Sequence, residues 1–303
     1  MPLSGGMAQK CALPWGAGDD QARGHGLPVN SDDPYAFARA HRAFGYGAAY
    51  CPPVGLNDPT RLSHIRKAFA AEGVVIAEIG IWRNLVTPDE AVRKAHLSRA
   101  TECLAVAEEV GALCAVSYIG TYLAGSDYAP HPKNLSAEAF DDCVATVRAL
   151  IDAVRPKRAK FALEMMQYSL PDSVDNYVDL IRAVDRPAFA AHLDPVNLIV
   201  TPRQYWGNGA LIRECFEKLG RRIVSCHAKD IVLHHQAALH FDEIIPGAGV
   251  LDYRTFLKEL DRLDDVPLML EHLSDPDYAK ARDHIFGVGD EIGIGFEGRA
   301  AKE

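Results

Sequence analysis

The chain has 303 residues, enough to bury a large core without disulfides, and its 48% hydrophobic and 24% charged residues are ordinary for a soluble globular protein. A formal net charge of −9 argues against nucleic-acid binding, because negative charge repels the phosphate backbone. Seven scattered cysteines, never in a Cys-x-x-Cys pair, argue against a disulfide framework or a zinc ribbon. The sequence shows no signal-peptide pattern and no apolar run near the roughly 18 residues that span a bilayer, so we expect a soluble, cytoplasmic protein without a membrane partner.

The first part of the chain predicts an arm followed by alternating strands and helices. Residues 1–20 are rich in glycine, alanine and proline and show no hydrophobic period, which predicts a flexible N-terminal arm. A weak strand at 24–29 precedes a helix at 31–44 with Ser31 or Asp32 as its cap. A short apolar run at 45–52 then precedes a helix at 58–73 that ends at a glycine.

The β-branched run 74–82 is typical of a buried parallel strand. The long helix expected after it, at 87–111, has Thr87 as its cap and Gly111 after its end. The same alternation continues to the end of the chain. Further strands are expected at 112–120, 160–166, 188–194, 222–230 and 266–272, and further helices at 136–154, 171–184, 202–219, 253–263 and 275–287.

Eight strand–helix units favour an α/β fold of the (β/α)₈ TIM-barrel type. The alternative, an open doubly wound sheet, usually carries a glycine-rich phosphate loop after its first strand, and HGLPVNSDD is not one. We expect one barrel domain over residues 21–288 and a glycine-rich tail over 289–303. Glycines 293, 295 and 298 form a G-x-G-x-x-G pattern, but too little chain follows for a dinucleotide-binding unit.

Four residues that can bind a metal fall at the ends of four consecutive expected strands: Glu164, Asp194, His227 and Glu271. Barrel active sites lie at the carboxyl ends of the strands, so these side chains should converge. Each sits in an apolar run, where a charge is costly unless it is paired or bound to a metal. A structural charge network is the alternative. Three carboxylates and one imidazole suit one divalent cation, with Mn²⁺ favoured and Mg²⁺ or Co²⁺ tolerated.

Four motifs in this region resemble those of the xylose-isomerase-like barrels of the sugar phosphate isomerase/epimerase type. They are HLDPVN (192–197), SCHAKD (225–230), PGAGVLDY (246–253) and LMLEHL (268–273). The resemblance runs from about Ile79 to Leu273, and it includes WRNLVTPDE (82–90) and FALEMM (161–166). It implies a barrel, one divalent cation and the four ligands just named.

The resemblance also implies a reaction in which a proton is removed beside the carbonyl of a keto sugar. In the ketose 3-epimerases of this superfamily, two metal-bound glutamates exchange that proton on opposite faces, and Glu164 and Glu271 match their positions. Those epimerases usually carry a histidine where this chain has Asn197, which can bind a hydroxyl but cannot titrate. The pattern also resembles the catalytic α subunits of C-glycoside deglycosidases, lyases that act on 3-oxo-glycosides by elimination. A noncatalytic sugar-binding barrel is a further alternative.

Other side chains complete the expected site. His192 and Lys229 each lie two residues from a predicted ligand and so face the same side of their strands, as candidate catalytic groups. An interior hydrogen-bonded histidine and a salt-bridged lysine are the alternative readings. His25, Trp82 and Asn197 are candidate substrate contacts. The expected partner is a small sugar or glycoside, and a homo-oligomer or a small partner subunit is compatible with this reading.

Overall fold

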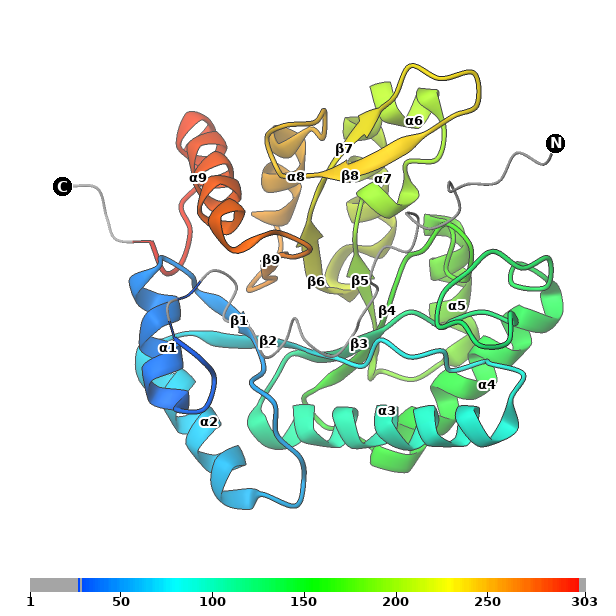
Figure 1. Ribbon diagram of the computed structural model, residues 1–303, viewed down its shortest axis with the longest axis horizontal. Helices are drawn as coiled ribbons and strands as arrows, with labels where there is room; N and C mark the ends of the chain where they lie inside the picture. Colours follow the sequence, from blue (N-terminus) through cyan, green and yellow to red (C-terminus); the bar gives the residue numbers. More distant parts are fainter. Residues whose placement is uncertain (1–26, 28, 300–303) are drawn as a thin grey trace, which may run out of the picture.

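The computed structural model describes Leu27 and residues 29–299, and in this part of the chain seven parallel strands form a nearly closed barrel (Figure 1). The expected (β/α)₈ TIM-barrel fold is confirmed. The hydroxyl of Tyr50 donates to the carbonyl oxygen of Leu270 over 3.5 Å and so links the first and last strands of the sheet. In sheet order the strands are β1 (Ala48–Tyr50), β2 (Val75–Gly80), β3 (Cys114–Ser117), β4 (Lys160–Glu164), β5 (Phe189–Leu193), β6 (Ile223–Ala228) and β9 (Leu268–Leu270).

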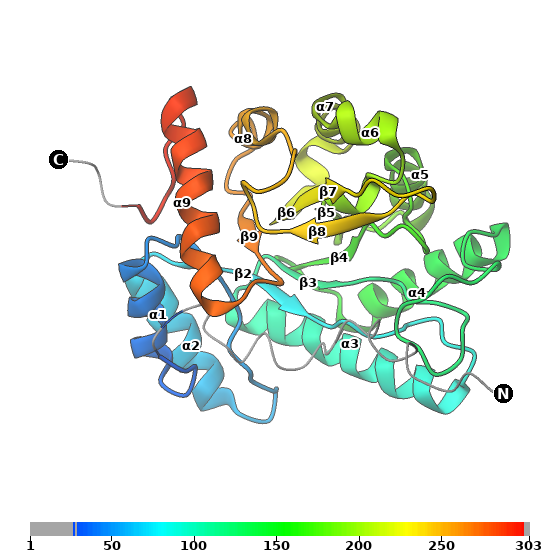
Figure 2. The ribbon, with the colours of Figure 1, turned by 45° about the horizontal axis from the view of Figure 1, so that its top comes forward.

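Helices surround the sheet on its outer face (Figures 1 and 2). They bury one continuous apolar layer against strands whose own residues are almost all buried, as parallel strands covered on both faces require. Within the described residues, none of them combines the length and apolar character needed to cross a bilayer. The helices are α1 (Pro34–Ala43), α2 (Pro59–Glu72), α3 (Glu90–Val110), α4 (Ala137–Val154), α5 (Val174–Val184), α6 (Pro202–Trp206), α7 (Asn208–Leu219), α8 (Tyr253–Leu260) and α9 (Asp275–Ile292).

In two helices the N-terminal cap lies further along the chain than the sequence indicated. The cap of α1 is Asp33, whose carboxylate accepts the N–H groups of Tyr35 and Ala36, and not Ser31 or Asp32. The cap of α3 is Asp89, whose carboxylate accepts the N–H of Val92 over 3.0 Å. In both cases an aspartate nearer the helix outcompetes the expected cap, because its side chain reaches the unpaired N–H groups of the first turn.

The expected first strand and the arm before it fall mainly outside the described residues. Of residues 24–29, only Leu27 and Val29 are described; neither belongs to a strand, and both pack against the core. The seven remaining expected strands are present, each within or overlapping its predicted range. The last helix, expected at 275–287, continues to Ile292.

An antiparallel hairpin follows β6, where the sequence indicated a strand running to Asp230 and then a loop. Its strands are β7 (Asp230–Leu233) and β8 (Phe241–Ile244). The hairpin lies beside α6 (Figure 2), where the rings of Phe241 and Tyr205 are 5.8 Å apart. Leu233 and Phe241 pack against the core, so this ribbon is anchored to the barrel.

Candidate metal centre

The four predicted metal ligands converge at the carboxyl ends of four neighbouring strands. Glu164 ends β4, Asp194 directly follows β5, His227 lies in β6, and Glu271 directly follows β9. One ligand atom from each lies within 4.8 Å of all the others. Asp194 and His227 are fully buried, and Glu164 and Glu271 nearly so. The strand order therefore assembles one compact set of three carboxylates and one imidazole.

Two cationic side chains contact these carboxylates. Nδ1 of His227 lies 2.9 Å from Oε1 of Glu164 and 2.8 Å from Oε1 of Glu271. Nζ of Lys229 lies 2.9 Å from Oδ2 of Asp194 and 2.5 Å from Oε1 of Glu271. The lysine that the sequence placed at the barrel mouth thus reaches two of the four predicted ligands.

Two of the carboxylate oxygens nevertheless lack hydrogen bonds. Oδ2 of Asp194 and Oε1 of Glu271 are shielded from solvent and accept no hydrogen bond, although both lie within ion-pair distance of Lys229. Buried carboxylate oxygens without hydrogen bonds are costly in a protein interior. Oxygen-rich sets of this kind suit hard divalent cations, so the residues present fit a bound ion.

Burial and neighbouring charges shift the pKa values of the charged side chains at this site. Burial raises the pKa of Asp194 above its ordinary value, in spite of the nearby Lys229 ammonium. Burial also raises the pKa of Glu271, but His227 and Lys229 outweigh it, and the net shift is well downward. For His227, burial favours the neutral ring, yet the carboxylates of Glu271 and Glu78 hold its pKa well above the usual range. The negative charge of the pocket thus favours a cation within it.

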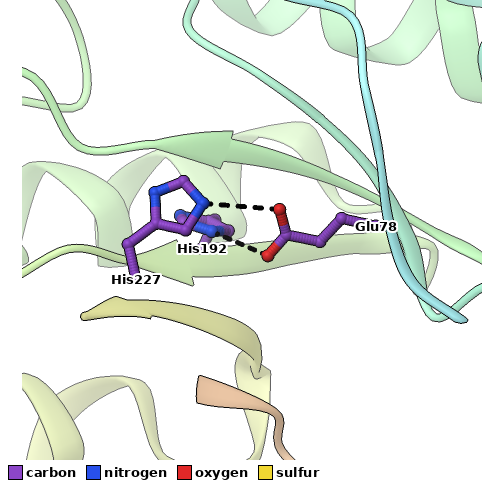
Figure 3. Close-up of side chains that lie close together, drawn as sticks. All are labelled: Glu78, His192 and His227. Atoms are coloured by element: carbon purple, nitrogen blue, oxygen red, sulfur yellow. Dashed lines mark hydrogen bonds and ion pairs between the residues drawn. The ribbon is translucent and has the colours of Figure 1, made fainter. Parts of the chain in front are cut away.

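Glu78 is a member of this site that the sequence analysis missed. It lies on β2 with its side chain fully buried. Its carboxylate faces two imidazoles (Figure 3): Oε1 is 3.1 Å from Nε2 of His192, and Oε2 is 3.4 Å from Nε2 of His227. The hydroxyl of Ser225 also donates to Oε1. Burial raises the pKa of Glu78, but the two histidines outweigh it and lower the pKa well below the usual range. The signal was present, since Glu78 is the one charged residue in the apolar run 74–82.

His192 lies in the interior beside His227. Its ring meets that of His227 edge to face, with centroids 4.1 Å apart, and it is fully buried. Its contact with Glu78 agrees with the reading of an interior histidine, and Nδ1 has no hydrogen-bond partner.

A second acidic residue, Glu243 on β8, reaches the site from the hairpin, and no sequence pattern predicted it. Its Oε2 lies 3.4 Å from Nζ of Lys229, and its Oε1 lies 3.0 Å from Nδ1 of His272. His272 follows Glu271 and has a left-handed backbone, with φ of +57°. The hairpin therefore adds a carboxylate that is about one-third exposed beside a nearly closed cluster.

Of the three predicted substrate contacts, Trp82 lies beside His227, Asn197 is buried, and His25 is outside the described residues. Trp82 follows β2 in a left-handed conformation (φ +45°), and its ring centroid lies 6.1 Å from that of His227. Asn197 lies in the short 3₁₀ turn Val196–Leu198, is buried, and donates from Nδ2 to Sδ of Met166 at 3.4 Å. His25 lies outside the described residues. The structure therefore brings Trp82 next to His227, one of the predicted metal ligands.

Several solved structures have the same fold and match this chain over most of its length. A xylose isomerase-like TIM barrel protein from Mycobacterium smegmatis, in complex with magnesium, is 20% identical with a TM-score of 0.62 and covers 86% of this chain and 92% of its own. D-psicose 3-epimerase from Clostridium cellulolyticum H10, with D-tagatose, is 14% identical with a TM-score of 0.60, covering 84% and 93%. A 3-keto-D-glucoside 4-epimerase from E. coli is 14% identical with a TM-score of 0.60, covering 84% and 95%.

At these identities the likeness demonstrates a shared fold. No curated protein matches the sequence significantly. The family model described as "xylose isomerase-like TIM barrel" matches residues 38–286, which is most of the chain. The chain belongs to the xylose isomerase-like TIM barrel family.

Proposed function

We propose that the protein is a divalent-metal-dependent enzyme that removes a proton beside the carbonyl of a keto sugar, as a sugar isomerase or epimerase. The observation that carries this proposal is the convergence of Glu164, Asp194, His227 and Glu271, with two buried carboxylate oxygens that accept no hydrogen bond. These four residues would hold the ion, with Mn²⁺ favoured and Mg²⁺ or Co²⁺ accepted. When bound, it would polarise the carbonyl and hydroxyl oxygens of the sugar and lower the cost of an enediolate.

Glu164 and Glu271 are the proposed acid/base pair. They come from β4 and β9, which are separated in the sheet by β5 and β6, so their carboxylates can reach a substrate from different sides. One carboxylate would take the proton from the carbon beside the carbonyl, and the other would return it on the opposite face. The two epimerases described above have names that indicate inversion at a carbon next to a carbonyl, which supports this reaction class.

The remaining residues would assist without carrying the proton. Lys229 would hold Asp194 and Glu271 in place and could bind a substrate oxygen. Trp82 would offer its ring to a sugar face beside His227. His192 would position His227 through Glu78. We place the protein in the cytoplasm, where its six described cysteines, all free and buried, would stay reduced.

A lyase acting on 3-oxo-C-glycosides is the second candidate. It is favoured by Asn197, whose amide is buried against Met166 and cannot titrate where the ketose 3-epimerases carry a histidine. Such an enzyme shares the first deprotonation but then expels the aglycone, so it needs one base and one acid for the leaving group. A smaller partner subunit would be compatible with this activity.

Exchange of the substrate proton with D₂O tests both candidates at once. Manganese-loaded protein is incubated with ketoses and 3-oxo-C-glycosides, and deuterium incorporation, epimer and free aglycone are measured by NMR and mass spectrometry. Glu164→Gln and Glu271→Gln should each lower turnover by about 10²–10⁴-fold, the usual loss for a missing general base. Glu138→Gln, an exposed residue in the first turn of α4, is the control.

The products of this experiment distinguish the candidate functions. Epimer formation supports the isomerase/epimerase, and aglycone release without epimer supports the lyase. Near-wild-type turnover in both glutamine variants with the metal retained would contradict the acid/base assignment. Sugar binding with no exchange on any substrate would leave a noncatalytic binding barrel.

A further inference from the structure

The β7–β8 hairpin carries a second cluster of metal-binding side chains, away from the barrel ligands. Its register pairs Val232 with Asp242 and Leu233 with Phe241. Beyond these pairs, the N–H of His234 donates to the carbonyl oxygen of His240 over 2.9 Å, which brings the two histidines opposite each other. The pairing thus extends beyond the last ladder residues and places the two histidine residues side by side across the hairpin.

The alternation of side chains along the two strands places three potential ligands on one face. Residues two apart on a strand share a face, so Asp242 lies beside His240, and the cross-strand partner His234 joins them. Residues Leu233 and Phe241 point to the opposite face and pack against the core. The hairpin is therefore fixed to the barrel through one face and presents the two histidines and the aspartate on the other.

The three side chains already converge. Nε2 of His234 lies 2.8 Å from Oδ2 of Asp242, and Nε2 of His240 lies 3.1 Å from Oδ1 of the same carboxylate. One ligand atom from each residue lies within 4.8 Å of the other two. Nε2 of His234 is shielded from solvent yet makes no hydrogen bond, in spite of its short distance to Asp242. The nitrogen is thus aimed at the centre of the cluster without a hydrogen-bonding partner.

We propose that His234, His240 and Asp242 form a binding site for a divalent transition-metal ion of the zinc type. Two imidazoles and one carboxylate are a ligand set that Zn²⁺ adopts with an open fourth position, and imidazole nitrogen favours such ions over Mg²⁺ or Mn²⁺. The side chains of the three ligands are between 40% and 54% exposed, so an ion can enter directly from solvent. This site shares no ligand with the barrel centre and does not depend on the proposed function.

This site is connected to the barrel centre through Glu243, the residue that follows Asp242. Asp242 is followed on β8 by Glu243, which points the other way and contacts Lys229 and His272. An ion bound on the outer face would hold β7 and β8 together at the point from which Glu243 reaches inward. The hairpin site would therefore steady a carboxylate at the edge of the barrel pocket.

Zinc stoichiometry tests the proposal. Apoprotein is dialysed against Zn²⁺ and the bound metal is measured by elemental analysis, in the wild-type chain and in the double variant His234→Gln/His240→Gln. We expect the double variant to bind about one equivalent fewer than the wild type. The same difference is expected in a Glu164→Gln/Asp194→Asn background, where the barrel ligands are weakened. The matched control is His235→Gln, which removes the exposed neighbouring histidine outside the cluster.

Equal zinc stoichiometry in the wild-type and double-variant proteins would overturn the proposal. So would a loss in His235→Gln as large as that in the double variant, since it would indicate unspecific binding by the hairpin histidines. Because the side chains of His234 and His240 are 40% and 51% exposed, the double variant should fold, and matching thermal unfolding of the metal-free proteins checks this. A loss confined to the double variant supports the assigned ligands.

Discussion

His227 has two different neighbours on its two ring nitrogens, and this difference determines how it can bind a cation. Nε2 faces the buried carboxylate of Glu78, and Nδ1 faces Glu164 and Glu271. When Nε2–H donates to Glu78, the lone pair of Nδ1 is directed to the carboxylates. A carboxylate behind a histidine ligand fixes the tautomer and orients the ring. We therefore expect Glu78 to position His227 for a bound ion.

We predict that Glu78→Gln weakens metal binding. The amide keeps the shape of the side chain but can no longer accept hydrogen bonds from both imidazoles as a charged group, so His227 loses its fixed tautomer. Loss of such a partner typically lowers metal affinity about 10–100-fold. Isothermal titration of the apoprotein with Mn²⁺ measures the change. Glu72→Gln, at the exposed end of α2, is the control, and an unchanged dissociation constant in Glu78→Gln would contradict the role.

Asp230 organises the connection between the hairpin and α8. Its carboxylate, nearly fully buried, accepts the N–H groups of Ile231, Gly247, Gly249 and Leu251 at 2.8–3.1 Å. Two of these bonds hold the turn 246–250 through the N–H groups of Gly247 and Gly249. Gly247 adopts φ of +94°, a left-handed conformation that favours glycine. The conformation of this turn is therefore held by the carboxylate of Asp230.

We predict that Asp230→Ala destabilises the protein by at least about 3 kcal/mol, because buried N–H groups left without acceptors each cost about 1–3 kcal/mol. Asp230→Asn, which retains one carbonyl acceptor, should lose less. Urea unfolding at neutral pH gives both free energies of unfolding. Asp141→Ala, an exposed aspartate on α4, is the control. A change below 1 kcal/mol in Asp230→Ala, by the same measurement, would show that the turn does not depend on this carboxylate.

Among the helices and strands, sequence patterns predicted the features that depend on neighbouring residues in the chain, such as where a helix ends. Glycines after helices, such as Gly73 and Gly111, end α2 and α3 in the left-handed conformation as expected. The β7–β8 hairpin was missed, because each of its strands spans only four residues and its connecting segment is polar. A polar connection between two such short strands has the same pattern as a loop. Only the anchoring of Leu233 and Phe241 on the core distinguishes the two, and that contact is tertiary.

At the scale of the molecule, the order of strands explains both the successes and the omissions at the site. The convergence of four candidate ligands at four strand ends could be predicted, because parallel barrel strands bring their carboxyl ends together. Glu78 could not be assigned in this way. It lies on β2, across the barrel from β5 and β6, and its partners depend on which residues of those strands point inward at the same height. Sequence periodicity does not specify that cross-barrel register.

The same arrangement predicts that an ion at the barrel centre stabilises the whole fold. Its ligands come from β4, β5, β6 and β9, and β9 is the strand next to the barrel closure at Tyr50. A ligand that binds only the folded state stabilises it by about 2.7 kcal/mol at one hundred times its dissociation constant. Urea unfolding in Mn²⁺ should therefore give a higher free energy of unfolding than unfolding in EDTA.

Mn²⁺ suits this test because the hairpin cluster, with two imidazoles, should prefer a zinc-type ion. In Glu164→Gln/Asp194→Asn the difference between Mn²⁺ and EDTA should largely disappear, since two of the three anionic ligands are neutral. His234→Gln/His240→Gln should keep the full difference. If wild-type protein unfolds at the same urea concentration in Mn²⁺ and in EDTA, Lys229 and His227 alone balance the buried carboxylates, and the cluster is a charge network within the barrel.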